Sequence, residues 1–208
     1  MNVAFVYDEA HKLRVMETVF LAENYLHLTG VEAHRGISAS RFFELCLDEK
    51  LSINDFDLKD FTTELKLSVF DRFINIDSNA KMLGDFNLQR PKLYTEKLVG
   101  NIYACIGFVK GGDQYYIPNT SLKEDIRDVV THANRVIAIY SKGIQNRFYD
   151  SLLYQAKGVI LDEKILPKEL IGRLRVDKEK KPVIILETAY KQLQVERGIK
   201  LGREDKER

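Results

Sequence analysis

The residue best suited to proton transfer is His27, within residues 25–31 (YLHLTGV). A histidine titrates near neutral pH, so its imidazole can exchange a proton with a substrate oxygen. The same position also fits a histidine that caps the C-terminal end of a helix, where the helix dipole favours a cation. Local sequence alone favours the capping role. Chemistry at His27, with Thr29 beside it as a substrate-binding candidate, therefore requires partners from elsewhere in the chain.

Hydroxyl and cationic side chains gather in the second half of the chain. Placed beside a sheet, such groups can hold a phosphate and stabilise a pentacoordinate transition state electrostatically. The alternative is that the serine caps a helix through a Ser-x-x-Glu capping box and that the basic residues form a solvated face. The candidates are Thr120, Ser121, Lys123 and Arg127, with Lys142 at the end of an expected strand and Lys97 just before another.

Tyrosines are frequent in the same region, and Tyr103 and Tyr116 are candidates for substrate binding. Exposed tyrosines can stack on unpaired bases. Tyrosines on strands are also common as half-buried packing residues. The two interpretations remain open at this point.

Metal and cofactor sites are not expected. His11, His34 and His132 lack ligand spacing with one another or with a cysteine. Cys46 and Cys105 each sit in an apolar pattern, which is typical of reduced, buried thiols. The Gly111-Gly112 pair is a turn signal, because no phosphate-binding glycine motif surrounds it.

The overall composition is that of a globular protein, with 208 residues, 45% hydrophobic and 30% charged. A net charge of +1 gives no global attraction for nucleic acid, although a local basic groove would suffice. No stretch approaches the ~20 apolar residues of a membrane span. The N-terminus lacks a signal peptide pattern. We expect a protein of the host cytoplasm with no membrane partner.

The central element should be an antiparallel hairpin. Residues 101–110 (NIYACIGFVK) alternate between apolar and mixed faces, a Gly-Gly-Asp turn follows, and residues 114–118 (QYYIP) form the second strand. The capping box predicts a short helix after this strand, and the competing interpretation continues the strand through Leu122. A third run, residues 135–140 (RVIAIY), is expected to pair with the hairpin.

Helices are expected before this sheet. Apolar residues at helical spacing predict an amphipathic helix over residues 8–26, ended by Gly30. Ser38 or Ser40 should cap a second helix that runs to about residue 51. The sequence thus predicts an α+β fold, in which N-terminal helices are followed by a small twisted antiparallel β-sheet.

The remaining elements are less regular in pattern. We expect a strand and then a short helix over residues 64–75, and a connector over residues 76–90. A helix is expected over residues 146–157 and a last core strand over residues 159–161.

The composition changes near residue 162, which predicts one domain over 1–162 and an appendage over 163–208. The appendage carries 13 Lys/Arg against 9 Asp/Glu and is therefore basic. It should contain a strand over residues 182–187 and a helix over residues 188–199, pack on the same domain, and fray at its end.

Six segments across residues 15–162 resemble a known family. They are YLHLTGV (25–31), FFELCLDEKLSINDF (42–56), TTELKLSVF (62–70), KLYTEKLVGNIYACIGF (92–108), YYIPNTSLKEDIRD (115–128) and RVIAIYSK (135–142). In order and wording they resemble the barnase/EndoU/colicin/RelE-like (BECR-fold) predicted nucleases of phages and mobile elements.

This resemblance implies N-terminal helices followed by a small antiparallel sheet. It also implies metal-independent RNA cleavage, in which a 2′-hydroxyl attacks its own phosphate without a cofactor. His27 would be the acid/base group, and Thr120 and Ser121 would orient the phosphate. The cationic stabilisers would be Lys97, Lys123, Arg127 and Lys142.

Three functions follow as hypotheses. The first is an endoribonuclease acting on a host RNA. The second is an inactive binding module on the same fold, which binds or inhibits a host or phage protein or a nucleic acid. The third is an oligomeric structural protein that uses its C-terminal segment as the contact. The oligomeric state is not fixed by the sequence.

Overall fold

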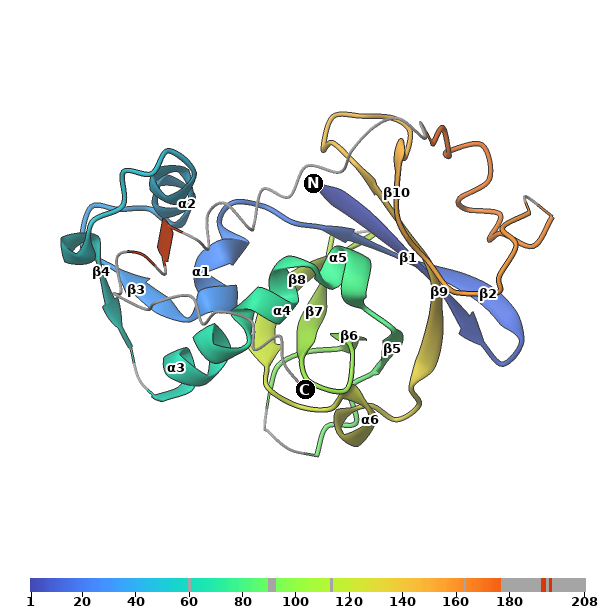
Figure 1. The fold of residues 1–208 in the computed structure, drawn as a ribbon, viewed down its shortest axis with the longest axis horizontal. Coiled ribbons are helices and arrows are strands. Elements are labelled where there is room, and N and C mark those ends of the chain that lie inside the picture. The colour runs from blue at the N-terminus through green and yellow to red at the C-terminus, as the bar shows by residue number, and fades with distance from the viewer. Residues whose placement is uncertain are drawn as a thin grey trace, which may run out of the picture.

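The computed structural model describes residues 1–59, 61–89, 93–112, 114–162, 164–176, 192–193 and 195. In this part of the chain the fold is mostly β, and one eight-stranded sheet organises it (Figure 1). Its strands are β1 (Asn2–Glu9), β2 (Lys12–Val19), β5 (Met82–Asp85), β6 (Lys97–Gly100), β7 (Cys105–Gly111), β8 (Tyr115–Leu122), β9 (Asn134–Lys142) and β10 (Ser151–Gln155).

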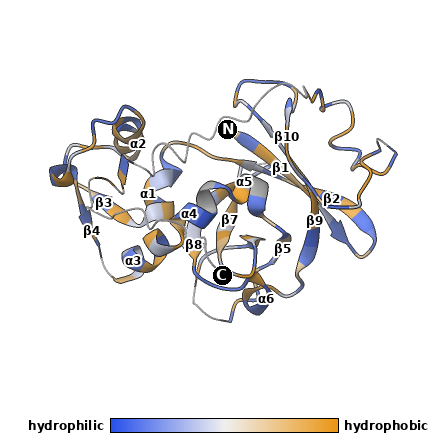
Figure 2. Ribbon diagram, viewed as in Figure 1, coloured by the Kyte–Doolittle hydropathy of each residue, from blue (hydrophilic) through white to orange (hydrophobic). Residues whose placement is uncertain are grey.

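The sheet closes on itself. Its order is β1-β2-β8-β7-β6-β5-β9-β10, and β1 also pairs with β9. Most neighbours are antiparallel, but β2 and β8 pair in parallel through Thr18 and Tyr116, so the sheet is mixed. In Figure 2 the residues of β7 are mostly hydrophobic, whereas β9 begins with hydrophilic residues. Buried residues of both strands contribute to the main core cluster.

The remaining elements are short. The helices are α1 (Asn24–Thr29), α2 (Ala39–Leu47), α3 (Phe61–Ser68), α4 (Phe70–Ile74), α5 (Ile76–Asn79) and α6 (Ile126–Val129), with a 3-10 turn at Ile53–Asp55. A small separate sheet pairs β3 (Val31–Ala33) with β4 (Phe56–Leu58). In Figure 1, α1, α2, α3 and the small sheet lie together to the left of the large sheet.

The prediction of N-terminal helices followed by a small antiparallel sheet is wrong. The chain begins with β1, whose residues 2–7 are all buried, and β1 lies between β2 and β9. The residues predicted as a helix over 8–26 instead finish β1, turn, form β2 and only then enter α1. Ala10 and His11 form the turn with φ angles of 50° and 64°, as the tight turn of a two-residue hairpin requires.

The physical reason for this error lies in β2. Leu13 and Val15 pack into one core cluster, while Met16 on the other face packs into a second. A strand covered on both faces has apolar residues at mixed spacing, and here positions 13, 16 and 20 imitate a helix. Burial on both faces of the sheet therefore favours the strand conformation of β2 over the helix that the spacing imitates.

The central hairpin is confirmed as the antiparallel pair β7 and β8. The helix starting at Ser121 is wrong, because β8 continues through Leu122, as the competing interpretation had it. The short helix α6 begins later, where the Asp125 side chain accepts a hydrogen bond from the Arg127 N–H. Ser121 instead faces the core and is 2% exposed.

The predicted pairing of the third run with the hairpin is wrong. These residues form β9, which pairs with β1 on one edge and with β5 and β10 on the other. The helix predicted over residues 146–157 is also wrong, since this region contains β10. No strand forms over the described residues 159–161.

The second predicted helix is confirmed as α2, with the Ser38 hydroxyl accepting from the Arg41 N–H. The strand expected from residue 64 is wrong, because this stretch lies in α3, whereas the short helix expected after it is present as α4. Residues 76–90, predicted as a connector, contain α5 and β5.

The C-terminal residues that the structure describes contact the large sheet and the core. Leu166 and Leu170 are buried in a cluster with strand residues. Arg173 forms a two-point ion pair with Glu17 of β2, with Nη2–Oε2 at 2.7 Å, and Glu17 also accepts from the Tyr149 hydroxyl at 2.9 Å. Leu193 is fully buried in the main core. The strand predicted over 182–187 and most of the predicted helix over 188–199 lie outside the described residues.

The small sheet carries a pH-sensitive pair. His34 Nε2 lies 2.8 Å from Asp57 Oδ2, and this hydrogen bond raises the pKa of His34 above its usual 6.5. Because the folded-state pKa is raised, the pair should stabilise β3–β4 below about pH 6.5 and lose this contribution as the pH rises through the raised pKa. We expect Asp57→Asn to bring the pKa of His34 down, as measured by NMR titration of the imidazole protons.

The matched control for this titration is Asp162→Asn, which removes a carboxylate elsewhere on the chain and should leave the His34 titration unchanged. Equal His34 pKa values in the wild type and Asp57→Asn would show that the pair does not form in solution.

Candidate active site

Helix α1 presents His27 to solvent. Tyr25, Leu28 and Thr29 are buried on the inner side of this one-and-a-half-turn helix, so His27 falls on the outer side and is exposed. The helix ends at Gly30, which has a φ of 73° and donates its N–H to the Leu26 carbonyl at 2.7 Å. The predicted stop at Gly30 is confirmed, and it fixes His27 in the last turn.

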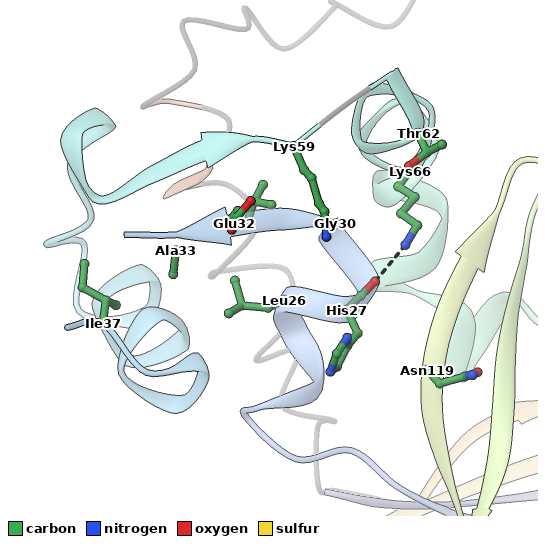
Figure 3. A pocket seen from close by; sticks show the side chains of 11 residues that line it. Leu26, His27, Gly30, Glu32, Ala33, Ile37, Lys59, Thr62, Lys66 and Asn119 are labelled. Carbon is green, nitrogen blue, oxygen red and sulfur yellow. Dashed lines mark hydrogen bonds between the residues drawn. The ribbon is translucent and has the colours of Figure 1, made fainter. Parts of the chain in front are cut away.

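A pocket of about 500 Å³ opens beside His27. Figure 3 shows that its lining comes from α1, β3, the residue that follows β4, α3 and β8. The polar side chains of the lining are His27, Glu32, Lys59, Thr62, Lys66 and Asn119.

Helix α3 is attached to the end of α1 by hydrogen bonds to main-chain carbonyls. Lys66 Nζ donates to the His27 carbonyl at 3.1 Å, and Thr63 Oγ1 donates to the Gly30 carbonyl at 2.8 Å (Figure 3 shows the first). A side chain at Gly30 would place its Cβ 3.0 Å from Lys66 Cδ, so glycine allows this close approach as well as the positive φ. The ammonium group of Lys66 is therefore held at the pocket.

Asn119 forms a fixed wall on the β8 side. Its Nδ2 donates to the Tyr94 carbonyl, and its Oδ1 accepts from Thr95 Oγ1 at 3.2 Å. Thr95 is itself buried and also donates to the Phe108 carbonyl. The Asn119 amide thus links β8 to the segment before β6.

The pocket lining combines an imidazole with positive charge. His27 is an exposed imidazole, and Lys59 and Lys66 contribute two ammonium groups against one carboxylate, that of Glu32. Ammonium groups in a partly enclosed pocket stabilise negative charge on a bound phosphate. A histidine and a carboxylate are the usual side chains for moving the two protons of a phosphate displacement.

Sequence reasoning did not identify Lys59, Lys66 or Glu32. A signal was present for one pair, since Thr62 and Lys66 are four residues apart and so share a face of a helix. Because the residues from 64 onward were predicted as a strand, the shared helical face of Thr62 and Lys66 was not recognised. Nothing in the local sequence brings Lys59 or Glu32 to His27, because β3 and β4 pair only in the folded chain.

The predicted hydroxyls have structural partners. Ser121 Oγ donates to the Leu28 carbonyl at 2.7 Å, and Thr29 Oγ1 donates to the Tyr25 carbonyl at 3.1 Å. Thr120 is 7% exposed, and its methyl group packs close to Gly107 of β7. This hydrogen bond of Ser121 joins β8 to α1 and so helps to position the helix that carries His27.

Lys97 and Tyr116 lie together in a second group. Lys97 pairs with Asp85 on the neighbouring strand β5 and is close to Tyr7 and Tyr116. Burial works against the charge of Lys97, but the hydrogen bond to Asp85 and the charge interactions with Tyr7, Asp85 and Tyr116 together outweigh it and raise the pKa of Lys97. Burial raises the pKa of Tyr116. None of these residues lines the His27 pocket.

Lys142 is buried in a third group. Its Nζ lies 4.9 Å from the centre of the Tyr149 ring, and burial, with Arg173 adding to the effect, lowers the pKa of Lys142. Burial and the Glu17 carboxylate together raise the pKa of Tyr149. This group joins β9 and β2 to the segment that contains Arg173.

Lys123 and Arg127 are exposed near α6. Arg127 Nε donates to Asp125 Oδ1 at 3.0 Å, and this hydrogen bond lowers the pKa of Asp125. Tyr103 lies at a separate pocket, described below. Of the site residues predicted from sequence, His27 alone is among the described residues that line its pocket.

Metal-binding clusters and membrane-spanning helices are both absent from the described residues. In the ranges given above, no three His, Cys, Asp or Glu side chains are grouped so that they could hold a metal ion. Within the same ranges, none of the helices has the length and apolar character needed to cross a bilayer.

The pocket thus sets the exposed His27 of α1 and Lys66 of α3 beside Lys59, which follows β4, and Asn119 of the large sheet. Residues 1–158 match the family described as phage-Barnase-EndoU-ColicinE5/D-RelE like nuclease 4, and the chain belongs to this family. The resemblance found in the sequence is thereby confirmed. Comparison with curated proteins and with solved structures gave no match. All residues of the His27 pocket fall within the matched range.

Proposed function

We propose that this chain is an endoribonuclease that cleaves host RNA by attack of a ribose 2′-hydroxyl on the adjacent phosphate. The observation that carries the proposal is the pocket whose lining includes His27, Lys59, Lys66 and Glu32. Membership of a nuclease-like family supports the choice of a phosphodiester as substrate. Two buried, unpaired cysteines suit a reducing compartment, in keeping with action in the host cytoplasm.

The reaction needs two proton transfers and one charge to be stabilised. A base takes the proton of the 2′-hydroxyl as its oxygen bonds to phosphorus, and an acid protonates the 5′-oxygen as the old bond to phosphorus breaks. His27 and Glu32 are the titratable side chains of the pocket that fit these two roles. The ammonium groups of Lys59 and Lys66 offset the negative charge that develops on the phosphate oxygens.

This mechanism uses no metal ion, so it can be tested directly. Purified protein incubated with total cellular RNA in excess EDTA is expected to give discrete cleavage products. Intact RNA in the presence of folded protein, judged by circular dichroism, would remove the proposal and would favour the binding module.

A further inference from the structure

A second pocket, of about 510 Å³, lies between α4, β5 and the turn that joins β6 to β7. Its lining includes Arg72, Lys81, Asn101, Ile102 and Tyr103. None of these residues lines the His27 pocket. The pocket contains an exposed aromatic ring and two cations, which is the chemistry that holds a nucleotide outside a duplex.

The turn holds Tyr103 rigidly in an exposed position. Asn101 Oδ1 accepts from the N–H groups of Tyr103 at 2.8 Å and Ala104 at 3.2 Å, and its own N–H donates to the Ala104 carbonyl. The Ile126 N–H donates to the Asn101 carbonyl, which fastens the turn to α6. A Cβ at Gly100 would lie 2.3 Å from the Ala104 oxygen, so the turn closes too tightly for any side chain there.

Tyr103 remains 57% exposed although its backbone is fixed in this way. A large aromatic side chain held in water by a rigid turn loses little conformational entropy when a flat partner stacks on it. The neighbouring Ile102 is 44% exposed and adds apolar surface. This arrangement is pre-organised for stacking.

The two cations of the pocket are directed toward aromatic rings. Arg72 Cζ lies 4.6 Å from the centre of the Tyr103 ring, and Lys81 Nζ lies 3.7 Å from that of Tyr154. Among the described residues, neither cation forms an ion pair with a carboxylate. The carboxylate of Asp71 also lines the pocket, and it accepts a hydrogen bond from the main chain of Arg72. Both cations are therefore suited to a phosphate that arrives beside a stacked base.

From these features we infer that the pocket is a nucleotide subsite for single-stranded RNA, in which a base stacks on Tyr103 and a neighbouring phosphate contacts Arg72 and Lys81. Bases inside a duplex are already stacked and cannot reach a side chain in this way. The inference deepens the proposed function and rests on it for the choice of RNA.

The two pockets are lined by residues that are near one another in the sequence. Arg72 of α4 follows Lys66 of α3 by six positions, and only Val69 separates the two helices. Six residues of chain span at most about 20 Å even when fully extended. The Cα atoms of Lys66 and Arg72, which line one pocket each, therefore lie within this distance of each other.

The test measures binding without cleavage. We would use a fluorescent 2′-O-methyl oligonucleotide of about twelve nucleotides, within the site sizes of single-stranded-binding folds. It lacks the nucleophilic hydroxyl, so fluorescence anisotropy reports affinity alone. Tyr103→Ala should weaken binding about tenfold, as expected for the loss of one base stack, and Tyr103→Phe should retain the affinity of the wild type.

Two comparisons complete the design. Lys81→Ala should weaken binding, whereas Lys12→Ala, which removes a lysine at the exposed β1–β2 hairpin, should not. The same sequence as a duplex should bind the wild type and Tyr103→Ala equally. Failure of the wild type to bind the strand, or equal affinity of the wild type and Tyr103→Ala, would overturn the subsite. Neither result would affect cleavage in EDTA, so the two proposals can fail separately.

Discussion

Replacing His27 with alanine is expected to lower the rate of RNA cleavage by about 10²–10⁴-fold, the usual contribution of a positioned acid or base. His27 is exposed in the last turn of α1, so its side chain adds little to the core. Lys66 bonds to the main-chain carbonyl of residue 27, which alanine retains. The free energy of unfolding should therefore change by less than about 0.5 kcal/mol.

The measurement is single-turnover cleavage of a defined RNA in EDTA, with urea unfolding of the same preparations. The matched control is His132→Ala, which removes another exposed histidine, in the loop between α6 and β9. This variant should cleave at the wild-type rate. Retained activity in His27→Ala would remove His27 from the mechanism.

The largest expected effect on stability comes from Phe42→Ala. Phe42 is completely buried, and its ring lies 6.2 Å from that of Tyr25 and 5.8 Å from that of Phe56, measured between centroids. It thus connects α2 with α1 and β4. Removal of such a ring leaves a cavity and usually costs about 3–5 kcal/mol. We expect this loss in the free energy of unfolding, measured with urea.

Phe43→Ala is the control for this variant. Phe43 is adjacent in α2 and contacts the same Tyr25 ring, at 5.1 Å, but is only partly buried. Its replacement should cost less than half as much. Equal losses for the two variants would show that the α1–α2 interface packs differently from the structure.

Local sequence signals predicted several elements correctly. The Gly-Gly turn between alternating strands identified β7 and β8, and Ser38 identified the start of α2. Gly30 marked the end of α1. In each case one residue type satisfies a local backbone requirement, so short-range chemistry is enough.

The closed sheet could not be predicted in the same way. Apolar residues in β2 are buried on both faces, because the strand lies between β1 and β8 within a sheet that closes through β9. Its turn uses Ala10 and His11 at positive φ and lacks the Asn-Gly signal of such turns. The strand was therefore mistaken for a helix, and the fold class was wrong.

The candidate site was predicted only in part. His27 is present at a pocket, but Lys59 and Lys66 reach it through pairing of β3 with β4 and through the attachment of α3 to α1. These are long-range contacts, which residue spacing does not encode. Conversely, Lys97 and Lys142 carry the ammonium group that was expected to stabilise a phosphate, but both have other partners. Lys97 pairs with Asp85, and Lys142 is buried against Tyr149.

The most direct test of the central claim is the chemistry of the RNA ends produced in excess EDTA. Attack by the 2′-hydroxyl gives a 2′,3′-cyclic phosphate and a 5′-hydroxyl, and it cannot occur on a strand that is 2′-O-methylated at the cleavage position. We predict cyclic phosphate ends from unmodified RNA and no cleavage at the methylated position. Products with 3′-hydroxyl and 5′-phosphate ends, or cleavage of the methylated strand, would contradict the mechanism assigned to the His27 pocket.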